Sequence, residues 1–292
     1  MTRRLDGFLQ VLERARARRG VALMGVCNVT PDSFSDGGRY LGVEEARARV
    51  DELLAEGADL VDVGGESTRP GAAPVPPAEQ LARVLDVVRY AAGKGACVTV
   101  DTTSPAVAAA CLDAGACGVN DVSCLRDVEL AQVVAASGAA LVLMHARGTQ
   151  AQMRGFSEYP DDAYGDVVDD VRTEWRAAAE RALAAGVAPG ALVMDPGLGF
   201  AKNARQSVEL LRRVGELVAS VHAPVAVGAS RKSFLTRAGA CLDREAAPRQ
   251  RLGASLAAAL WAAKAGAAVL RVHDVRPTAQ VLDLTRLLEK GP

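Results

Sequence analysis

The sequence predicts an α/β protein, a (β/α)8 (TIM) barrel with one additional N-terminal helix. Eight short apolar runs recur along the 292 residues, and segments with helical periodicity lie between them. The apolar runs are continuous rather than alternating, which is typical of parallel strands buried on both faces. Eight such units in a chain of this length close most simply into a single barrel.

The additional helix is expected at about residues 3–19, before the first strand. Leu5, Phe8 and Leu12 fall on one face of it, so this face should pack against the barrel. Its arginines are reminiscent of a transit peptide. However, the segment contains acidic residues and lacks serine, which does not fit that class of peptide.

Each of the eight expected strands is a short apolar run that ends in a polar loop. The strands are expected at 21–27, 59–64, 97–101, 118–122, 140–145, 191–195, 224–228 and 269–274. Between the first two, the segment 43–57 has apolar residues at helical spacing, and Gly57 is its expected C-cap.

An open doubly wound sheet is the alternative architecture. Its dinucleotide-binding members carry a GxGxxG turn after the first strand, and none follows the first strand here. No linker or change in composition marks a second domain, so residues 1–292 are predicted to form one domain.

The charge balance argues against nucleic acid or an anionic membrane as a partner, because the 34 basic and 35 acidic residues nearly cancel. The most apolar segment, 253–270, is interrupted by Lys264 and is interpreted as a buried helix followed by a strand, not as a membrane span. The helix within it is a candidate surface for a dimer contact.

The six cysteines form no CxxC pair, and no segment reads as a signal peptide. They are therefore predicted to be reduced thiols, packed as small hydrophobic residues in a cytoplasmic protein.

Polar residues lie at or just after the C-terminal end of every predicted strand, at the end of the barrel where (β/α)8 enzymes hold their catalytic groups. They are Asn28, the segment 64–72, Asp101, Asn120, Asp121, His145, Arg147, Asp195, the segment 230–233, Arg271 and His273. This shared placement predicts one site at the C-terminal rim.

Part of this set suits a flat heterocycle. Asp101, Asn120 and Asp195 offer acceptors to amino and ring N–H groups, and Lys232 supplies a donor to a ring carbonyl. Each residue also has a structural alternative when it is taken alone. Asp101 is a possible N-cap for a helix that starts near Pro105, and Asp195 a possible turn residue.

A second set, Arg271, His273 and Asn28, is typical of a site for phosphate or metal-bound phosphate. The loop that begins at Asn28, NVTPDSFSDGG (28–38), exceeds the roughly two to six residues of a plain strand–helix connection. It is interpreted as a mobile lid, with Gly37-Gly38 as its hinge.

Taken together, the motifs resemble those of the dihydropteroate synthases, the folate-pathway members of the pterin-binding family. Seven motifs occur in the family's order: NVTPDSFSDGG (28–38), ESTRPGA (66–72), VNDVS (119–123), LMHARGT (143–149), DPGLGF (195–200), SRKS (230–233) and RVHDV (271–275). The resemblance implies a transferase that condenses 6-hydroxymethyl-7,8-dihydropterin diphosphate with 4-aminobenzoate. The products are 7,8-dihydropteroate and diphosphate.

The resemblance also implies residue roles. Pterin contact is implied for Asp101, Asn120, Met144, Asp195, Phe200 and Lys232. Diphosphate contact is implied for Asn28, Thr68, Arg271 and His273, and Asn28 is also the implied ligand of a Mg²⁺ cofactor. The 4-aminobenzoate side is implied for Phe34, Arg69, Pro70 and Ser233, with Asp32 and Phe34 in the mobile first loop. Catalytic roles are implied for Asp101, Lys232, Arg271 and His273.

Small-molecule substrates, a homodimer and inhibition by sulfonamides are further implications of the resemblance. Two positions, Ala146 and Ala201, differ from residues that are frequent in the family, and they affect the expected shape of the pocket. Dissociative loss of diphosphate followed by attack of the amine is the expected mechanism.

Two alternatives share the pterin site: a methyltransferase acting on methyltetrahydrofolate, and a non-catalytic pterin-binding paralogue. SRKS and STRPG together favour the synthase over the methyltransferase. The retention of Asn28, Lys232 and Arg271 favours an active enzyme over the paralogue.

Overall fold

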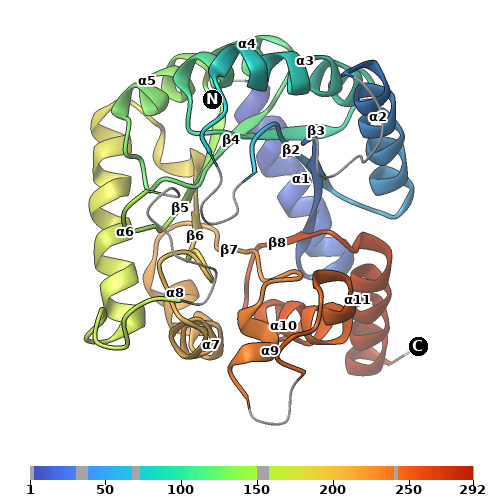
Figure 1. The fold of residues 1–292 in the computed structure, drawn as a ribbon. Helices are drawn as coiled ribbons and strands as arrows, with labels where there is room; N and C mark the ends of the chain where they lie inside the picture. Colours follow the sequence, from blue (N-terminus) through green and yellow to red (C-terminus); the bar gives the residue numbers. More distant parts are fainter. Residues whose placement is uncertain (1–2, 31–38, 68–72, 150–157, 240–242, 292) are drawn as a thin grey trace.

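A computed structural model describes residues 3–30, 39–67, 73–149, 158–239 and 243–291, and it has eight parallel strands ringed by helices (Figure 1). The strands are β1 (Ala22–Asn28), β2 (Leu60–Gly64), β3 (Cys97–Asp101), β4 (Gly118–Asp121), β5 (Ala140–Met144), β6 (Leu192–Asp195), β7 (Ala226–Val227) and β8 (Val269–Val272). Their order is β6-β5-β4-β3-β2-β1-β8-β7, and a parallel bridge between Met194 and Val225 brings the two ends of the sheet together. The predicted (β/α)8 barrel is therefore confirmed.

The helices alternate with the strands and cover the outside of the barrel (Figure 1). They are α1 (Arg3–Arg19), α2 (Arg39–Ala55), α3 (Pro77–Gly93), α4 (Pro105–Asp113), α5 (Val128–Ser137), α6 (Val167–Ala184), α7 (Ala204–Arg212), α8 (Val214–Ser220), α9 (Phe234–Arg237), α10 (Leu252–Lys264) and α11 (Val275–Lys290), with short 3₁₀ helices at Pro189–Ala191 and Pro248–Arg251. Side-chain caps fix several starts. Asp166 accepts hydrogen bonds from the first turn of α6, and Asn203 forms a capping box with Gln206 on α7.

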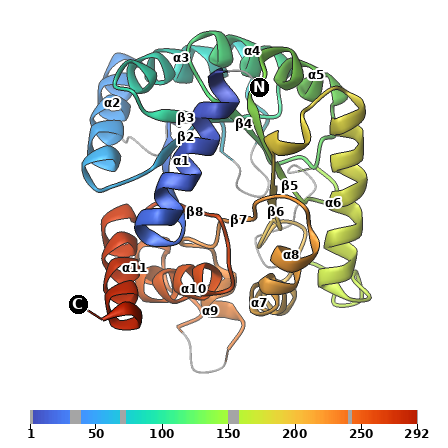
Figure 2. The same cartoon turned by 180° about the vertical axis from the view of Figure 1, so that it is seen from behind.

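Helix α1 lies across the barrel at the end where the strands begin (Figure 2). The predicted span of residues 3–19 is confirmed, and its apolar face is buried, with Leu5 3% and Phe8 1% exposed. Since α1 covers this end, the residues that follow the strands collect at the opposite end.

The cysteine prediction is wrong for one pair, because Cys97 and Cys117 form a disulfide. Cys97 begins β3 and Cys117 immediately precedes β4, so the pairing of these neighbouring strands brings their Cα atoms to 5.9 Å. That distance lies in the usual range for a disulfide. Cys27 and Cys111 are free and buried in the core, as expected for small hydrophobic residues.

Within the described ranges, none of the helices combines the length and apolar character that a bilayer crossing requires. The segment 253–270 forms most of α10 and the start of β8 instead, as the sequence predicts.

Candidate active site

Strand register places several of the predicted site residues in one row. Asn28 of β1 pairs with Gly64 of β2, Gly64 with Asp101 of β3, and Asp101 with Asn120 of β4. Gly64 adds no side chain to this row. A Cβ there would contact both neighbours, at 3.4 Å from Cβ of Asp101 and 3.5 Å from Oδ1 of Asn28. Four neighbouring strands thus bring two amides and a carboxylate to one level of the rim.

Arg271 of β8 joins this row through two carboxylates. Its Nη2 donates to Oδ2 of Asp101 at 2.7 Å, and its Nε donates to Oδ2 of Asp62 at 2.6 Å. The Arg271 side chain is 19% exposed, whereas Asp62 is fully buried and Asp101 is 5% exposed. The guanidinium is therefore held at the rim of the barrel by buried acceptors.

Asp62 is the polar centre beneath the row. Its Oδ1 accepts from Oγ1 of Thr99 at 2.6 Å, and its Oδ2 also accepts from Nδ2 of Asn120 at 3.1 Å. Both Asn120 and Arg271 are thus oriented by one carboxylate. Asp62 was not among the predicted site residues, because those were the polar residues at or after the ends of strands. The available signal was a carboxylate inside the otherwise apolar strand LVDVG.

Burial raises the pKa of Asp101 to about 7, although Arg271 acts in the opposite direction. Burial alone would lower the pKa of Arg271, but the carboxylates of Asp62 and Asp101 outweigh it and raise this pKa. Asp101 is consequently a carboxyl group that titrates near neutral pH while Arg271 stays charged.

Asp101 does not cap the helix that follows it. Ser104 caps α4, with its side chain accepting from the amide of Val107 at 3.4 Å. Asp195, in contrast, does stabilise a turn, because its Oδ1 accepts from the amide of Gly197 at 2.7 Å. This hydrogen bond leaves Oδ2 of Asp195 beside Gly228, a glycine that the stem of Arg271 also adjoins.

The loop after β6, residues 195–201, brings Phe200 to the same end of the barrel. Phe200 packs with Val122 and Met144 in a small apolar cluster separate from the main core, with Ala146 against it. Nζ of Lys232 lies 4.5 Å from the centre of the Phe200 ring and donates to the carbonyl of Leu198 at 2.6 Å. The charged end of Lys232 thus lies beside the apolar cluster that contains Phe200.

Asp195 and Lys232 influence each other electrostatically. Burial raises the pKa of Asp195, and Lys232 opposes that rise. Burial lowers the pKa of Lys232 to about 8, with Asp195 acting in the opposite direction. The arrangement offers one acceptor and one donor to a planar ligand beside Phe200.

His273 lies near Arg271 but makes different contacts. The amide of His273 donates to Oγ of Ser230 at 3.2 Å, and its Nδ1 lies 3.1 Å from the same oxygen. Since burial and the nearby arginines lower the pKa of His273 to about 3, the ring is neutral. When the hydroxyl of Ser230 donates to Nδ1, the proton of the neutral ring lies on Nε2.

The remaining predicted residues fall in two groups. Ser233 is 8% exposed and directly precedes α9. Phe34, Thr68, Arg69 and Pro70, together with Asp32, lie outside the described residues. The structure therefore places Asn28, Asp101, Asn120, Asp195, Lys232 and Arg271 at the C-terminal end of the barrel, with Met144 and Phe200 in an adjacent apolar cluster and His273 near Arg271.

Comparison with known proteins agrees with this arrangement. Residues 24–273 match the model of the family described as pterin binding enzyme. A dihydropteroate synthase of Mycobacterium leprae is 46% identical over 275 residues, which cover 93% of this chain and 95% of that protein. The dihydropteroate synthase of Escherichia coli K12 is 39% identical over 261 residues, which cover 89% of each chain.

Solved structures give the same result. The dihydropteroate synthase of Xanthomonas albilineans, determined with 4-aminobenzoic acid, superposes with a TM-score of 0.83 at 39% identity and covers 93% of this chain and 94% of that one. The enzyme from Thermus thermophilus, in complex with 6HMPPP, gives a TM-score of 0.76 at 39% identity, with 92% and 94% covered. The chain therefore belongs to the pterin binding enzyme family and, within it, to the dihydropteroate synthases, which are transferases.

Proposed function

We propose that this protein condenses 6-hydroxymethyl-7,8-dihydropterin diphosphate with 4-aminobenzoate, giving 7,8-dihydropteroate and diphosphate. The observation that carries the proposal is the hydrogen bonding of Arg271 to Asp101 and Asp62 at the level of Asn120. Structures of the Xanthomonas albilineans relative hold 4-aminobenzoic acid in one case and 7,8-dihydropteroate in another, which supports the same substrate class here. We propose that residues 1–292 act as a single domain in the cytoplasm.

The pterin is proposed to lie between the row of polar groups and the β6 loop. Asp101, Asn120 and Asp195 would accept from or donate to its amino and ring nitrogen groups, and Lys232 would donate to its carbonyl. Met144 and Phe200 would pack against its faces. Charged and amide groups in a largely buried site provide specificity, because an unmatched ligand would leave them unpaired.

Diphosphate is proposed to bind toward Asn28, Arg271, His273 and Thr68. A bidentate guanidinium and an Nε2–H donor are both suited to phosphate oxygens. Since Arg271 is already anchored by two buried carboxylates, it needs little reorganisation when the negative charge of the diphosphate arrives.

Asn28 fits the expected role in holding Mg²⁺. Its half-buried carboxamide presents Oδ1 at the rim beside Gly64, and Mg²⁺ usually takes one or two protein oxygens together with substrate phosphates and water. The described residues contain no group of three or more His, Cys, Asp or Glu side chains able to hold a metal ion. A magnesium ion bound at Asn28 supplies positive charge that stabilises the departing diphosphate.

The proposed mechanism is dissociative. The bond between the methylene carbon and the bridging oxygen breaks, and its electron pair leaves with diphosphate. The resulting pterin-methyl cation is delocalised into the ring and stabilised by the carboxylate of Asp101. The amine nitrogen of 4-aminobenzoate then forms the new C–N bond and loses a proton.

The 4-aminobenzoate side is proposed to involve Ser233 together with Phe34, Arg69 and Pro70. The loop 28–38 is proposed to close over the site and exclude water, which would otherwise capture the cation. Positional isotope exchange within the pterin diphosphate, with a non-nucleophilic analogue in place of 4-aminobenzoate, tests the order of bond breaking. Absence of exchange would count against the dissociative order.

Lys232→Ala is expected to lower turnover by roughly 10²-fold, because one directed donor at the site of reaction is lost. The assay measures diphosphate release and dihydropteroate formation with the pterin diphosphate, 4-aminobenzoate and Mg²⁺. A sulfonamide should compete with 4-aminobenzoate. Pterin binding without turnover in the unaltered protein would favour a non-catalytic paralogue. If the unaltered protein bound no pterin, the proposed pterin site would be wrong.

Activity is expected to follow a bell-shaped pH profile. kcat/KM for the pterin diphosphate should rise as Asp101 loses its proton near pH 7, and fall as Lys232 loses its proton near pH 8. In Asp101→Asn the limb near pH 7 should disappear from the residual activity. A profile of unchanged shape in this variant would assign that limb to another group.

A homodimer is proposed to use the surface of α10 and α11. Trp261 is 53%, Leu284 57% and Leu288 76% exposed, which is high for large apolar side chains. Light scattering of the purified protein measures its mass in solution, and a monomer at micromolar concentration would contradict this proposal.

A further inference from the structure

A set of polar side chains lies behind the β6 loop, on the side away from the proposed pterin site. The set comprises His145, Arg147, Tyr164, Glu174 and Lys202, which we call the Lys202 network. Lys202 is 1% exposed and His145 is fully buried. The proposed chemistry uses none of these side chains, although a buried lysine is costly to retain.

Alternation along the chain explains why the network faces away from the site. Met144 packs with Phe200, and Ala146 lies against that cluster, whereas His145 between them points toward α6. Successive residues of an extended segment face opposite sides. In the segment LMHARGT, Met144 and Ala146 therefore face the Phe200 cluster, whereas His145 and Arg147 belong to the network.

Lys202 reaches the back of the β6 loop through three contacts. Its Nζ donates to the carbonyl of Phe200 at 3.0 Å and to the carbonyl of Gly197 at 3.1 Å, and lies 2.9 Å from Nδ1 of His145. Burial lowers the pKa of Lys202 to about 7, and in the protonated form its ammonium group has three N–H donors, which match these three acceptors. All the hydrogen-bonding capacity of Lys202 is thus used to hold this loop and the His145 ring.

The tautomer of His145 follows from this match. Since Nδ1 accepts from Lys202, the ring proton lies on Nε2, which donates to Oε2 of Glu174 at 3.0 Å. Burial and the charge of Lys202 lower the pKa of His145 to about 4, which agrees with a neutral ring. Burial raises the pKa of Glu174, but His145 and Arg147 outweigh it and lower this pKa to about 2, so Glu174 is ionised.

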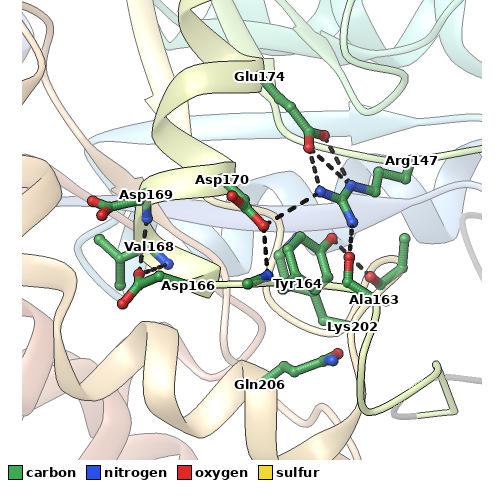
Figure 3. Close-up of polar contacts among 12 residues, drawn as sticks. Arg147, Ala163, Tyr164, Asp166, Val168, Asp169, Asp170, Glu174, Lys202 and Gln206 are labelled. Atoms are coloured by element: carbon green, nitrogen blue, oxygen red, sulfur yellow. Dashed lines mark hydrogen bonds and ion pairs between the residues drawn. The ribbon is translucent and has the colours of Figure 1, made fainter.

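Arg147, Glu174 and Tyr164 form the outer part of the network (Figure 3). Nε of Arg147 donates to both oxygens of Glu174, at 2.9 and 3.0 Å, and the guanidinium lies 3.8 Å from the centre of the Tyr164 ring. The Tyr164 hydroxyl donates to the carbonyl of Ala201 at 2.9 Å. Arg147 and Tyr164 therefore fix the end of the loop whose middle Lys202 holds.

The opposite side of the loop faces the proposed site. There Lys232 donates to the carbonyl of Leu198 and lies over the Phe200 ring. Both lysines thus donate to backbone carbonyls within residues 197–200. Gly197 also approaches residue 145 closely, because a Cβ on Gly197 would lie 2.0 Å from the carbonyl oxygen of His145.

We infer that Lys202 is a positioning residue for pterin recognition, acting through the carbonyls of Gly197 and Phe200 to hold Asp195 and Phe200 in place. This inference rests on the proposed pterin site. Lys202→Met would leave the carbonyls of Gly197 and Phe200 and Nδ1 of His145 without this donor. Stability is therefore expected to fall as well, and it has to be measured separately from pterin binding.

Lys202→Met is the decisive variant, and Lys94→Met is its matched control. Lys94 is exposed just after α3 and pairs with Asp51 at 3.2 Å, away from the β6 loop and from α10 and α11. Calorimetric titration with the pterin diphosphate, without 4-aminobenzoate, measures the pterin Kd, and steady-state assays measure kcat and the KM for 4-aminobenzoate. Far-UV circular dichroism and thermal melting report whether each variant is folded.

The pterin Kd of Lys202→Met is expected to rise about tenfold or more, because displacements on the order of 1 Å at a binding loop have effects of this size. The KM for 4-aminobenzoate should stay within about twofold of the unaltered value, and Lys94→Met should match the unaltered protein. An unchanged pterin Kd in folded Lys202→Met overturns the inference, as does an equal weakening of both substrates.

If the unaltered protein itself fails to bind the pterin diphosphate, the proposed function fails rather than this inference. If Lys202→Met does not fold, Glu174→Gln decides, since the Glu174 side chain is 37% exposed and tolerates change. A weakening of pterin binding by about threefold or more, with 4-aminobenzoate unaffected, supports the inference. Unchanged binding overturns it.

Discussion

Arg271→Met is expected to lower kcat/KM for the pterin diphosphate by about 10³-fold, the upper end of what loss of one charge-stabilising donor costs. The substitution removes the positive charge proposed to receive diphosphate. It also leaves two buried carboxylates, Asp62 and Asp101, without the group that separates their charges. Both consequences act on the transition state, so the loss should appear in kcat as well as in KM.

The same substitution should change the pH dependence. Arg271 is the group that opposes the rise of the Asp101 pKa, which burial brings to about 7. Without the guanidinium this pKa rises further, and the residual activity should need a higher pH to reach its maximum. The pH profile of purified Arg271→Met measures that shift.

Two further variants test whether the effect depends on the forked geometry of Arg271 and on its position. Arg271→Lys keeps the charge but loses the forked geometry, and we expect a loss of about 10²-fold. Arg89→Met alters an arginine of α3 that is 60% exposed, and it should be nearly neutral. A loss below about tenfold in Arg271→Met would place diphosphate elsewhere.

Most of the fold could be predicted because its strands are buried on both faces. Such strands are continuous apolar runs, and β3 was predicted at its observed bounds, Cys97–Asp101. The seventh strand is shorter than the predicted 224–228, since only Ala226–Val227 pair as a strand. Pro224 has no N–H for the ladder, and Val225 pairs with Met194 only as an isolated bridge.

The site was predictable only where strand ends define it. Asp101, Asn120 and Arg271 follow or end apolar runs, so the barrel rule brings them together. Asp62 lies two residues before the end of its strand, and its role depends on register and on an arginine 209 residues away. The Cys97–Cys117 pairing was missed for the same reason, because contacts between strands are not visible in sequence spacing.

Asp62→Asn is expected to lower the free energy of unfolding by about 3 kcal/mol, because it breaks a buried ion pair and leaves donors unmatched. Asp62 accepts from Thr99, Asn120 and Arg271, and it is fully buried. An asparagine has one oxygen, and its amide hydrogens would face groups that also donate. With a melting temperature change of roughly 2–4 °C per kcal/mol, the expected decrease is about 6–12 °C.

Asp113→Asn is the control for this variant, because Asp113 is exposed at the end of α4 and should change stability by less than about 0.5 kcal/mol. Thermal and urea unfolding measure both variants, and the kcat/KM of Asp62→Asn should fall as well, since Asn120 and Arg271 lose their shared anchor. If Asp62→Asn kept normal stability and activity, Asp101 alone would be orienting Arg271. The buried carboxylate would then not be what connects the barrel interior to the substrate site.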